Sequence, residues 1–140
     1  MDWNYLYASF DGRLNRKPYW IANLILIAAG MILSYLLLKI FGLSVATIFS
    51  LMWLYPTFAL NVKRAHDRNR PTWLMAVFFG LLVLLTLLQF FEIDQVGGEP
   101  TTLFLLVSIP WFVLAFFFFI DLGFLRGTRG PNRFGPDPLA

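Results

Sequence analysis

Four long stretches of the chain consist mostly of apolar residues and are separated by short polar segments. The stretches cover residues 20–41, 43–62, 73–91 and 102–125 and contain 19 to 24 residues each. A helix needs about 20 apolar residues to cross the ~30 Å hydrocarbon core of a bilayer, so each stretch is long enough to span a membrane. Short connections make consecutive helices antiparallel neighbours. We therefore predict an all-α, polytopic membrane protein with a four-helix transmembrane bundle.

Basic residues gather at one end of these predicted helices. Ten of the 11 Lys and Arg residues fall within residues 1–19, 63–72 and 126–140, and the remaining one is Lys39. Cytoplasmic loops of membrane proteins are enriched in Lys and Arg, so we predict that these three segments are cytoplasmic and that both termini are inside the cell. The connection over residues 92–101 contains three acidic residues and no basic residue, and we place it in the periplasm.

The composition excludes several other classes of protein. Of the 140 residues, 59% are hydrophobic, which leaves too little polar sequence to cover four apolar stretches in water. The net charge of +3 arises beside the predicted spans, where topology and anionic lipid headgroups explain it, so nucleic acid is not an expected partner. Cysteine is absent, which excludes disulfides and thiolate ligands. No segment outside the spans is long enough for a separate soluble domain, and we expect a single membrane domain over residues 1–140.

The polar residues of chemical interest lie in the three predicted cytoplasmic segments. Helices of one bundle end within about 10 Å of each other, so an arginine of one segment can reach a carboxylate of another. Asp121 lies near the membrane boundary, where a carboxylate needs a partner. Asp67 can pair with Lys63 or Arg64 along its own helix, which leaves Arg68 and the N-terminal arginines for Asp121. The predicted ionic or lipid-headgroup cluster consists of Arg13, Arg16, Arg64, His66, Asp67, Arg68, Asp121 and Asn132.

Several roles for this cluster remain open at the level of the sequence. The ion pairs can act as a structural clamp on the helix ends, as in a scaffold. Alternatively, the surplus arginines can bind an anionic lipid headgroup or present a surface to a membrane protein partner or a second copy of the chain. A further alternative is an oligomeric small channel or an exporter of a hydrophobic compound, although the spans contain few polar residues that could line a pathway.

Enzymatic activity is not expected. His66 is the only histidine, and a lone histidine beside Asp67 lacks both the further ligands of a metal site and a nucleophile to activate. The acidic residues Glu92, Asp94 and Glu99 are explained more simply by a solvated hairpin than by a calcium site. We therefore predict no catalytic residue, no metal site and no cofactor.

The C-terminal segment is predicted to fold back onto the bundle. Glycines at positions 127, 130 and 135 and prolines at positions 131, 136 and 138 prevent an extension of the last helix. Phe134 is an apolar residue that can dock against the helix ends. We therefore hypothesise that residues 127–138 form a latch or plug at the cytoplasmic side.

Together, the three polar segments resemble one known protein family. An F-x-G-R-x-x-R-x-x-[YF]-W motif is matched by Phe10, Gly12, Arg13, Arg16, Tyr19 and Trp20. An R-x-H-D-x-x-R-x-x-W motif is matched by Arg64, His66, Asp67, Arg70 and Trp73. A G-T-x-G-x-N-x-[YF]-G-x-D-P motif is matched by Gly127, Thr128, Gly130, Asn132, Phe134, Gly135, Asp137 and Pro138. In combination these motifs are similar to those of the small bacterial inner-membrane proteins called domain of unknown function 805, which implies a four-span protein of the bacterial inner (plasma) membrane without an established activity.

Overall fold

The computed structural model describes residues 2–139 and is largely helical. Its elements in chain order are α1 (Trp3–Tyr7), α2 (Arg16–Phe41), α3 (Leu43–Asp67), α4 (Thr72–Phe90), β1 (Gln95–Val96), β2 (Glu99–Pro100) and α5 (Thr102–Gly123). Within these residues, the four helices α2 to α5 are long and apolar enough to cross a membrane. The prediction of an all-α membrane protein with four transmembrane helices is confirmed.

Two of the spanning helices are longer than the predicted spans at one end. Helix α2 begins at Arg16, four residues before the predicted span, and Pro18 lies in its first turn, where a missing amide hydrogen removes no helical hydrogen bond. Helix α3 continues to Asp67, five residues beyond the predicted span. This continuation places Arg64 and Asp67 on the same helix, three residues apart.

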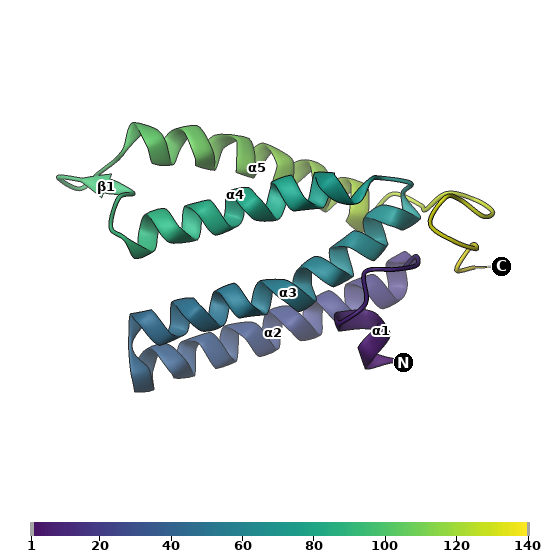
Figure 1. The fold of residues 1–140 in the computed structure, drawn as a ribbon, viewed down its shortest axis with the longest axis horizontal. Helices are drawn as coiled ribbons and strands as arrows, with labels where there is room; N and C mark the ends of the chain where they lie inside the picture. Colours follow the sequence, from purple (N-terminus) through teal and green to yellow (C-terminus); the bar gives the residue numbers. More distant parts are fainter. Residues whose placement is uncertain (1, 140) are drawn as a thin grey trace.

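The four long helices form two antiparallel hairpins, α2 with α3 and α4 with α5, which meet at one end (Figure 1). We call this end, where residues 2–15, 68–71 and 124–139 lie, the basic end. The opposite end holds the turn at Gly42, with a φ of 84°, and the β1–β2 hairpin, in which Gln95 pairs with Pro100. Figure 1 shows that the two hairpins diverge toward this opposite end, so the helices do not pack uniformly along their length as in a compact bundle. Lipid chains are as apolar as leucine side chains, so no hydrophobic force drives the hairpins together within a bilayer.

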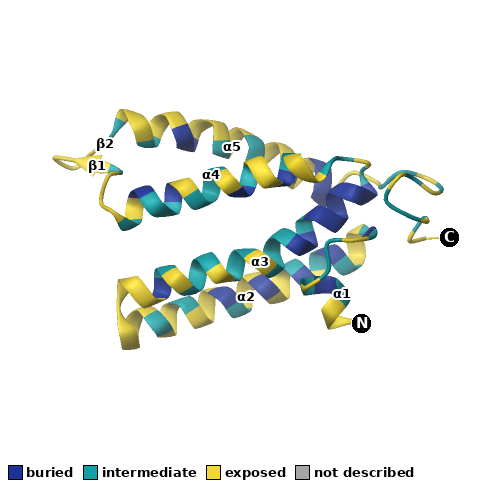
Figure 2. Cartoon of the chain, viewed as in Figure 1, coloured by how far each residue is buried: buried dark blue, intermediate teal, exposed yellow. Residues whose placement is uncertain are grey.

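Tight packing is concentrated at the basic end, as the dark blue residues of Figure 2 show. Leu60, Val62, Ala65 and Met75 are all 0% exposed there, in a cluster that also includes residues of α2 and α5. The outward faces of the helices instead expose large apolar side chains, as expected for surfaces in contact with lipid. The well-packed core therefore lies directly beneath the polar segments.

Small residues allow α2 to approach its neighbours closely. The Trp53 indole lies against Gly30, and its Nε1 donates to the Leu26 carbonyl oxygen at 3.2 Å. The Trp20 indole lies between α2 and α5, where Nε1 donates to the Gly123 carbonyl oxygen at 3.0 Å. These two tryptophans use small residues of the facing helix as contact points, a common feature of helix packing in membranes.

Candidate anion-binding site at the basic end

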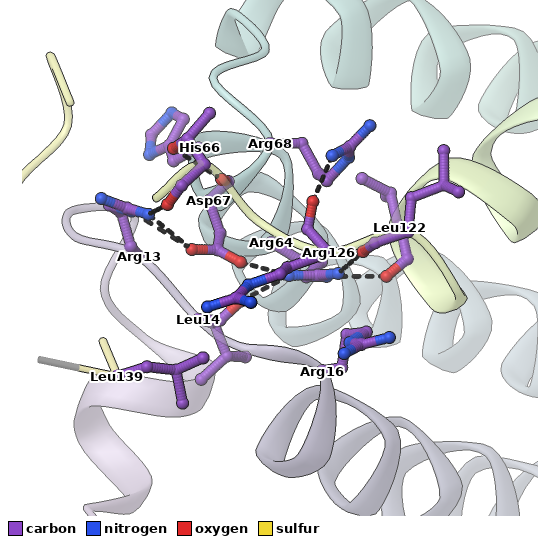
Figure 3. Close-up of polar contacts among 12 residues, drawn as sticks. Arg13, Leu14, Arg16, Arg64, His66, Asp67, Arg68, Leu122, Arg126 and Leu139 are labelled. Carbon is purple, nitrogen blue, oxygen red and sulfur yellow. Dashed lines mark hydrogen bonds and ion pairs between the residues drawn. The ribbon is translucent and has the colours of Figure 1, made fainter. Parts of the chain in front are cut away.

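Asp67, in the last turn of α3, pairs with two arginines (Figure 3). Arg13 Nη2 lies 3.0 Å from Asp67 Oδ1, and Arg64 Nη1 contacts Oδ2. The two guanidinium groups and the carboxylate are each at most 3% exposed. A buried ion pair of this kind is strongly coupled, since removing one partner leaves an uncompensated charge. The three side chains therefore act as a structural unit that joins the N-terminal segment to α3.

Asp121, near the end of α5, pairs with a second set of arginines. Its Oδ1 accepts from Arg68 Nε at 3.3 Å, from Arg68 Nη2 at 3.0 Å and from Arg70 Nη2 at 3.4 Å. The Asp121 side chain is 3% exposed, whereas those of Arg68 and Arg70 are 20% and 40% exposed. This pair links the α3–α4 connection to α5.

The observed pairing corrects the predicted one in three respects. Arg13 was expected to be available to Asp121, but it pairs with Asp67. Lys63 was a candidate partner of Asp67, but its ammonium donates to carbonyl oxygens of α1 because the N-terminal segment folds across α3. Arg16 was a candidate partner of Asp121, yet within residues 2–139 it takes part in no ion pair. The path of the N-terminal segment, which the helical pattern does not specify, decides all three.

The carboxyl end of α5 is capped by arginine side chains from other helices. Arg64 donates from Nε to the Leu122 carbonyl oxygen and from Nη2 to that of Leu125, both at 2.6 Å. Arg16 Nη1 donates to the Phe124 carbonyl oxygen at 3.0 Å. The last carbonyls of a helix have no partner within the helix and carry partial negative charge, so these cations stabilise the helix end.

The C-terminal segment, residues 124–139, is held against this end by Arg13 and Asp67. Arg13 donates to the carbonyl oxygens of Thr128 at 2.6 Å and Gly130 at 2.7 Å. Thr128 in turn donates from its backbone nitrogen and its hydroxyl to the Asp67 carbonyl oxygen, at 2.8 and 3.1 Å. The segment folds back as turns, as hypothesised from its glycines and prolines.

His66 and Asn132 complete the attachment of this segment. The His66 ring stacks on Phe134, with 3.8 Å between ring centroids and 4° between ring planes. His66 Nδ1 lies 3.2 Å from the Gly12 carbonyl oxygen, and Nε2 lies 2.8 Å from Thr72 Oγ1. Asn132 Nδ2 donates to the His66 carbonyl oxygen at 2.9 Å. Both side chains are thus used for contacts between chain segments.

A pocket of about 270 Å³ opens between the start of α2, the end of α5 and the C-terminal segment. We call it the basic pocket; it is lined by Asn15, Arg16, Lys17, Arg64, Asp67, Arg126, Gly127, Thr128, Asp137 and Leu139. Arg16 and Lys17 belong to the first turn of α2, where backbone N–H groups carry partial positive charge. The pocket therefore combines cationic side chains with the amino end of a long helix, an arrangement suited to an anion.

The acidic residues of the basic pocket are already engaged. Asp67 is held by its two arginines. Asp137 accepts from the backbone nitrogens of Leu139 at 3.0 Å and Gly130 at 2.9 Å, and these hydrogen bonds lower the pKa of its carboxyl group. Among the described residues, Lys17 and Arg126 form no ion pair with a carboxylate. Four cationic and two anionic lining side chains leave the pocket with an excess of positive charge.

The structure separates the eight predicted site residues into three groups. Arg16, Arg64 and Asp67 line the basic pocket. Arg68 and Asp121 form a separate ion pair, and Arg13, His66 and Asn132 attach the C-terminal segment.

Sequence reasoning missed four residues of this region. Lys17, Arg126 and Asp137 line the basic pocket, and Arg70 is a second partner of Asp121. Lys17 lies three residues before a predicted span and Arg126 directly after one, and this position was the available signal for both. Arg70 and Asp137 belong to the motifs of the family resemblance, which was the signal for these two. Over residues 2–139, no group of three or more His, Cys, Asp or Glu side chains could hold a metal ion.

Comparison with known proteins identifies the family of this chain. The family model described as "Protein of unknown function (DUF805)" matches residues 7–136. Among similar proteins of Escherichia coli (strain K12), inner membrane protein YhaI is 32% identical over 94% of this chain and 87% of its own length. Inner membrane protein YhaH is 31% identical over 99% of this chain and 97% of its own length, and the protein YiiR is 33% identical over 92% and 85%.

No solved structure matches the chain. The family match covers most of the sequence, including the three polar segments that meet at the basic end, and two of the relatives are named as inner-membrane proteins. This chain therefore belongs to the DUF805 family and is an integral protein of the inner membrane.

Proposed function

We propose that this protein is a non-enzymatic inner-membrane protein that binds the phosphate group of an anionic lipid in the basic pocket. The observation that carries the proposal is the convergence of Arg16, Lys17 and Arg126 on one pocket without a carboxylate partner in the described residues. Cationic side chains that are not neutralised by the protein attract an anionic ligand.

The position of the basic pocket favours a lipid headgroup over a soluble ligand. The pocket lies where α2 begins and α5 ends, which is the level at which a transmembrane helix passes from hydrocarbon into the headgroup layer. We further propose that the basic end faces the cytoplasm, because Lys and Arg are enriched in cytoplasmic loops. Anionic lipids attract each Lys or Arg near the membrane surface by about 1 kcal/mol.

The ion pairs around Asp67 support this role by holding the pocket walls. Arg64 joins α3 to the end of α5, and Arg13 joins the N-terminal segment to residues 128–130. Because these side chains are buried and mutually paired, we assign them to the shape of the pocket. Arg16, Lys17 and Arg126, which are exposed, are assigned to ligand contact.

The proposal can be tested by native mass spectrometry of the protein released from nanodiscs of phosphatidylcholine with a minor fraction of phosphatidylglycerol. The variant Arg126→Gln removes one pocket cation, and Arg129→Gln removes an exposed arginine of the same segment that does not line the pocket. We expect Arg126→Gln to reduce retained phosphatidylglycerol several-fold and Arg129→Gln to leave it unchanged. Equal loss in both variants, or no retained anionic lipid in the wild type, contradicts the proposal.

The same experiment distinguishes a lipid from a soluble anion and reports the number of copies. Inorganic phosphate at millimolar concentration should displace little lipid if the acyl chains contribute to binding; complete displacement would assign the pocket to a soluble phosphate. A lipid-free oligomer that conducts ions in liposomes would instead support the alternative of a small channel.

A further inference from the structure

A second candidate site lies on the outer side of α5. An apolar groove of about 280 Å³ follows this helix and ends at a carboxylate; it is lined by Val113, Phe116, Phe117, Ile120, Asp121 and Leu125. We call it the α5 groove. Val113 and Phe116 are 65% and 68% exposed, so the groove is accessible from the surrounding lipid. It shares no lining residue with the basic pocket.

The carboxylate at the end of the α5 groove has one oxygen without a hydrogen-bond partner. The three nitrogen atoms of Arg68 and Arg70 that donate to Asp121 all contact Oδ1. The other oxygen, Oδ2, is buried and accepts no hydrogen bond within residues 2–139. A buried acceptor left unsatisfied costs about 1–3 kcal/mol. The site therefore favours a ligand that carries a hydrogen-bond donor.

Arg70 supplies a cationic group at the same carboxylate. Its Nε is buried and donates no hydrogen bond within the described chain, while its Nη2 contacts Asp121 Oδ1 at 3.4 Å. The guanidinium lies over the Phe117 ring, 5.7 Å from the ring centroid, and Phe117 is part of the groove wall. A donor without a partner and an acceptor without a partner are thus found on two paired residues at the groove.

The net charge of Arg68, Arg70 and Asp121 determines which kind of hydrogen-bond donor is favoured in a ligand. Arg68 and Arg70 together exceed the single charge of Asp121, so a further cation such as an amine is opposed by electrostatic repulsion. An anionic oxygen is favoured at Arg70, and a hydroxyl can donate to Asp121 Oδ2 without adding positive charge.

We propose that the α5 groove binds an acyl chain of a phospholipid whose headgroup carries both an anionic phosphate and a free hydroxyl, as in phosphatidylglycerol. The phosphate accepts from Arg70, the hydroxyl donates to Asp121 Oδ2, and the chain lies along Val113 and Phe116. This site is separate from the basic pocket and selects for the hydroxyl as well as the charge, so it does not depend on the proposed function.

A matched pair of lipids tests this selectivity. Phosphatidylglycerol and phosphatidylmethanol carry the same charge, but only the first has free headgroup hydroxyls. We expect wild-type protein from nanodiscs that contain equal fractions of both to retain phosphatidylglycerol in at least threefold excess, measured by native mass spectrometry. Asp121→Asn replaces the free acceptor and should bring the ratio of the two lipids close to one.

A second variant covers the case in which Asp121→Asn fails to fold. Val113→Trp fills the α5 groove from its exposed side and should also bring the ratio close to one, whereas Val77→Trp, at a 47% exposed position of α4 outside the groove, should preserve it. Arg126→Gln should lower the retention of both lipids and raise their ratio, because it weakens the site that does not select for the hydroxyl; this separates the inference from the basic pocket. Equal retention of the two lipids by wild type, or an unchanged ratio in Val113→Trp, overturns the proposal.

Discussion

Gly127 lies directly against the carboxylate of Asp67, so that a Cβ atom at position 127 would overlap both carboxylate oxygens. The C-terminal segment passes over the buried ion pair at this point and closes one wall of the basic pocket. Position 127 requires glycine because the backbone passes so close to this carboxylate. Backbone conformation is not the reason, since Gly127 is not one of the glycines with positive φ in the described chain.

Substitution of this glycine should therefore disturb the ion pair. We expect Gly127→Ala to lower the free energy of unfolding by about 1–3 kcal/mol, because the added methyl group displaces either the segment or Asp67. Thermal unfolding in detergent measures the loss, and limited proteolysis should show faster cleavage after residue 127. Gly80→Ala is the matched control, since a Cβ at position 80 in α4 meets no atom within 4 Å; equal destabilisation by both variants would argue against this contact.

The two buried carboxylates should differ in how much they stabilise the protein. Asp67→Asn leaves Arg13 and Arg64 without a counter-charge in a buried site, and we expect a cost of about 3–5 kcal/mol. Asp121→Asn affects two arginines that are partly solvated, so its cost should be smaller, about 1–2 kcal/mol. Thermal unfolding of the two variants side by side tests the order; a larger effect at Asp121 would contradict it.

The attachment of the C-terminal segment to the basic end should weaken at acidic pH, when the Asp137 carboxylate becomes protonated. Its hydrogen bonds from the Leu139 and Gly130 backbone lower its pKa below the ordinary value of 3.8 in the folded protein. The stabilisation is therefore complete above the unfolded-state pKa and is lost as the pH falls through the lower, folded-state pKa.

We expect pepsin to cleave the C-terminal segment faster as the pH falls below about 4, relative to an unstructured peptide of the same sequence. In the variant Asp137→Asn, the C-terminal segment should be cleaved faster than in the wild type at every pH, and its cleavage rate relative to the free peptide should no longer depend on pH. A wild-type cleavage rate that follows the free peptide throughout would show that Asp137 does not hold the segment.

The proposed orientation makes a prediction about reporters fused to the chain. If the basic end is cytoplasmic, green fluorescent protein at the C-terminus should fluoresce, and alkaline phosphatase inserted between Gly97 and Gly98 should be active, because these reporters work on opposite sides of the inner membrane. Both glycines have positive φ in the exposed β1–β2 turn, so an insertion there disturbs little packing. The reverse pattern of activities would invert the proposed topology.

The candidate site could be predicted in part from the sequence. The concentration of arginines and aspartates in three segments was visible, and so was the local pair of Arg64 and Asp67, because residues three apart lie on one face of a helix. The pairing of Asp121 with Arg68 was predicted as well. Its second partner, Arg70, and the role of Lys63 were not visible, since they depend on how nonhelical segments cross the helix ends. The sequence of a nonhelical segment has no periodic pattern from which its path could be predicted.

The sequence by itself determined that the protein has four transmembrane helices, because helix length and hydropathy are matched to the thickness of a bilayer. Only the tertiary structure decided that the hairpins meet at one end, that Arg13 pairs with Asp67 and Arg70 with Asp121, and that Lys17 and Arg126 share a pocket with Asp137. The physical reason is the range of the interactions. Membrane insertion depends on the length and hydropathy of each segment by itself, whereas an ion pair or a pocket requires side chains from distant segments to meet within a few ångströms.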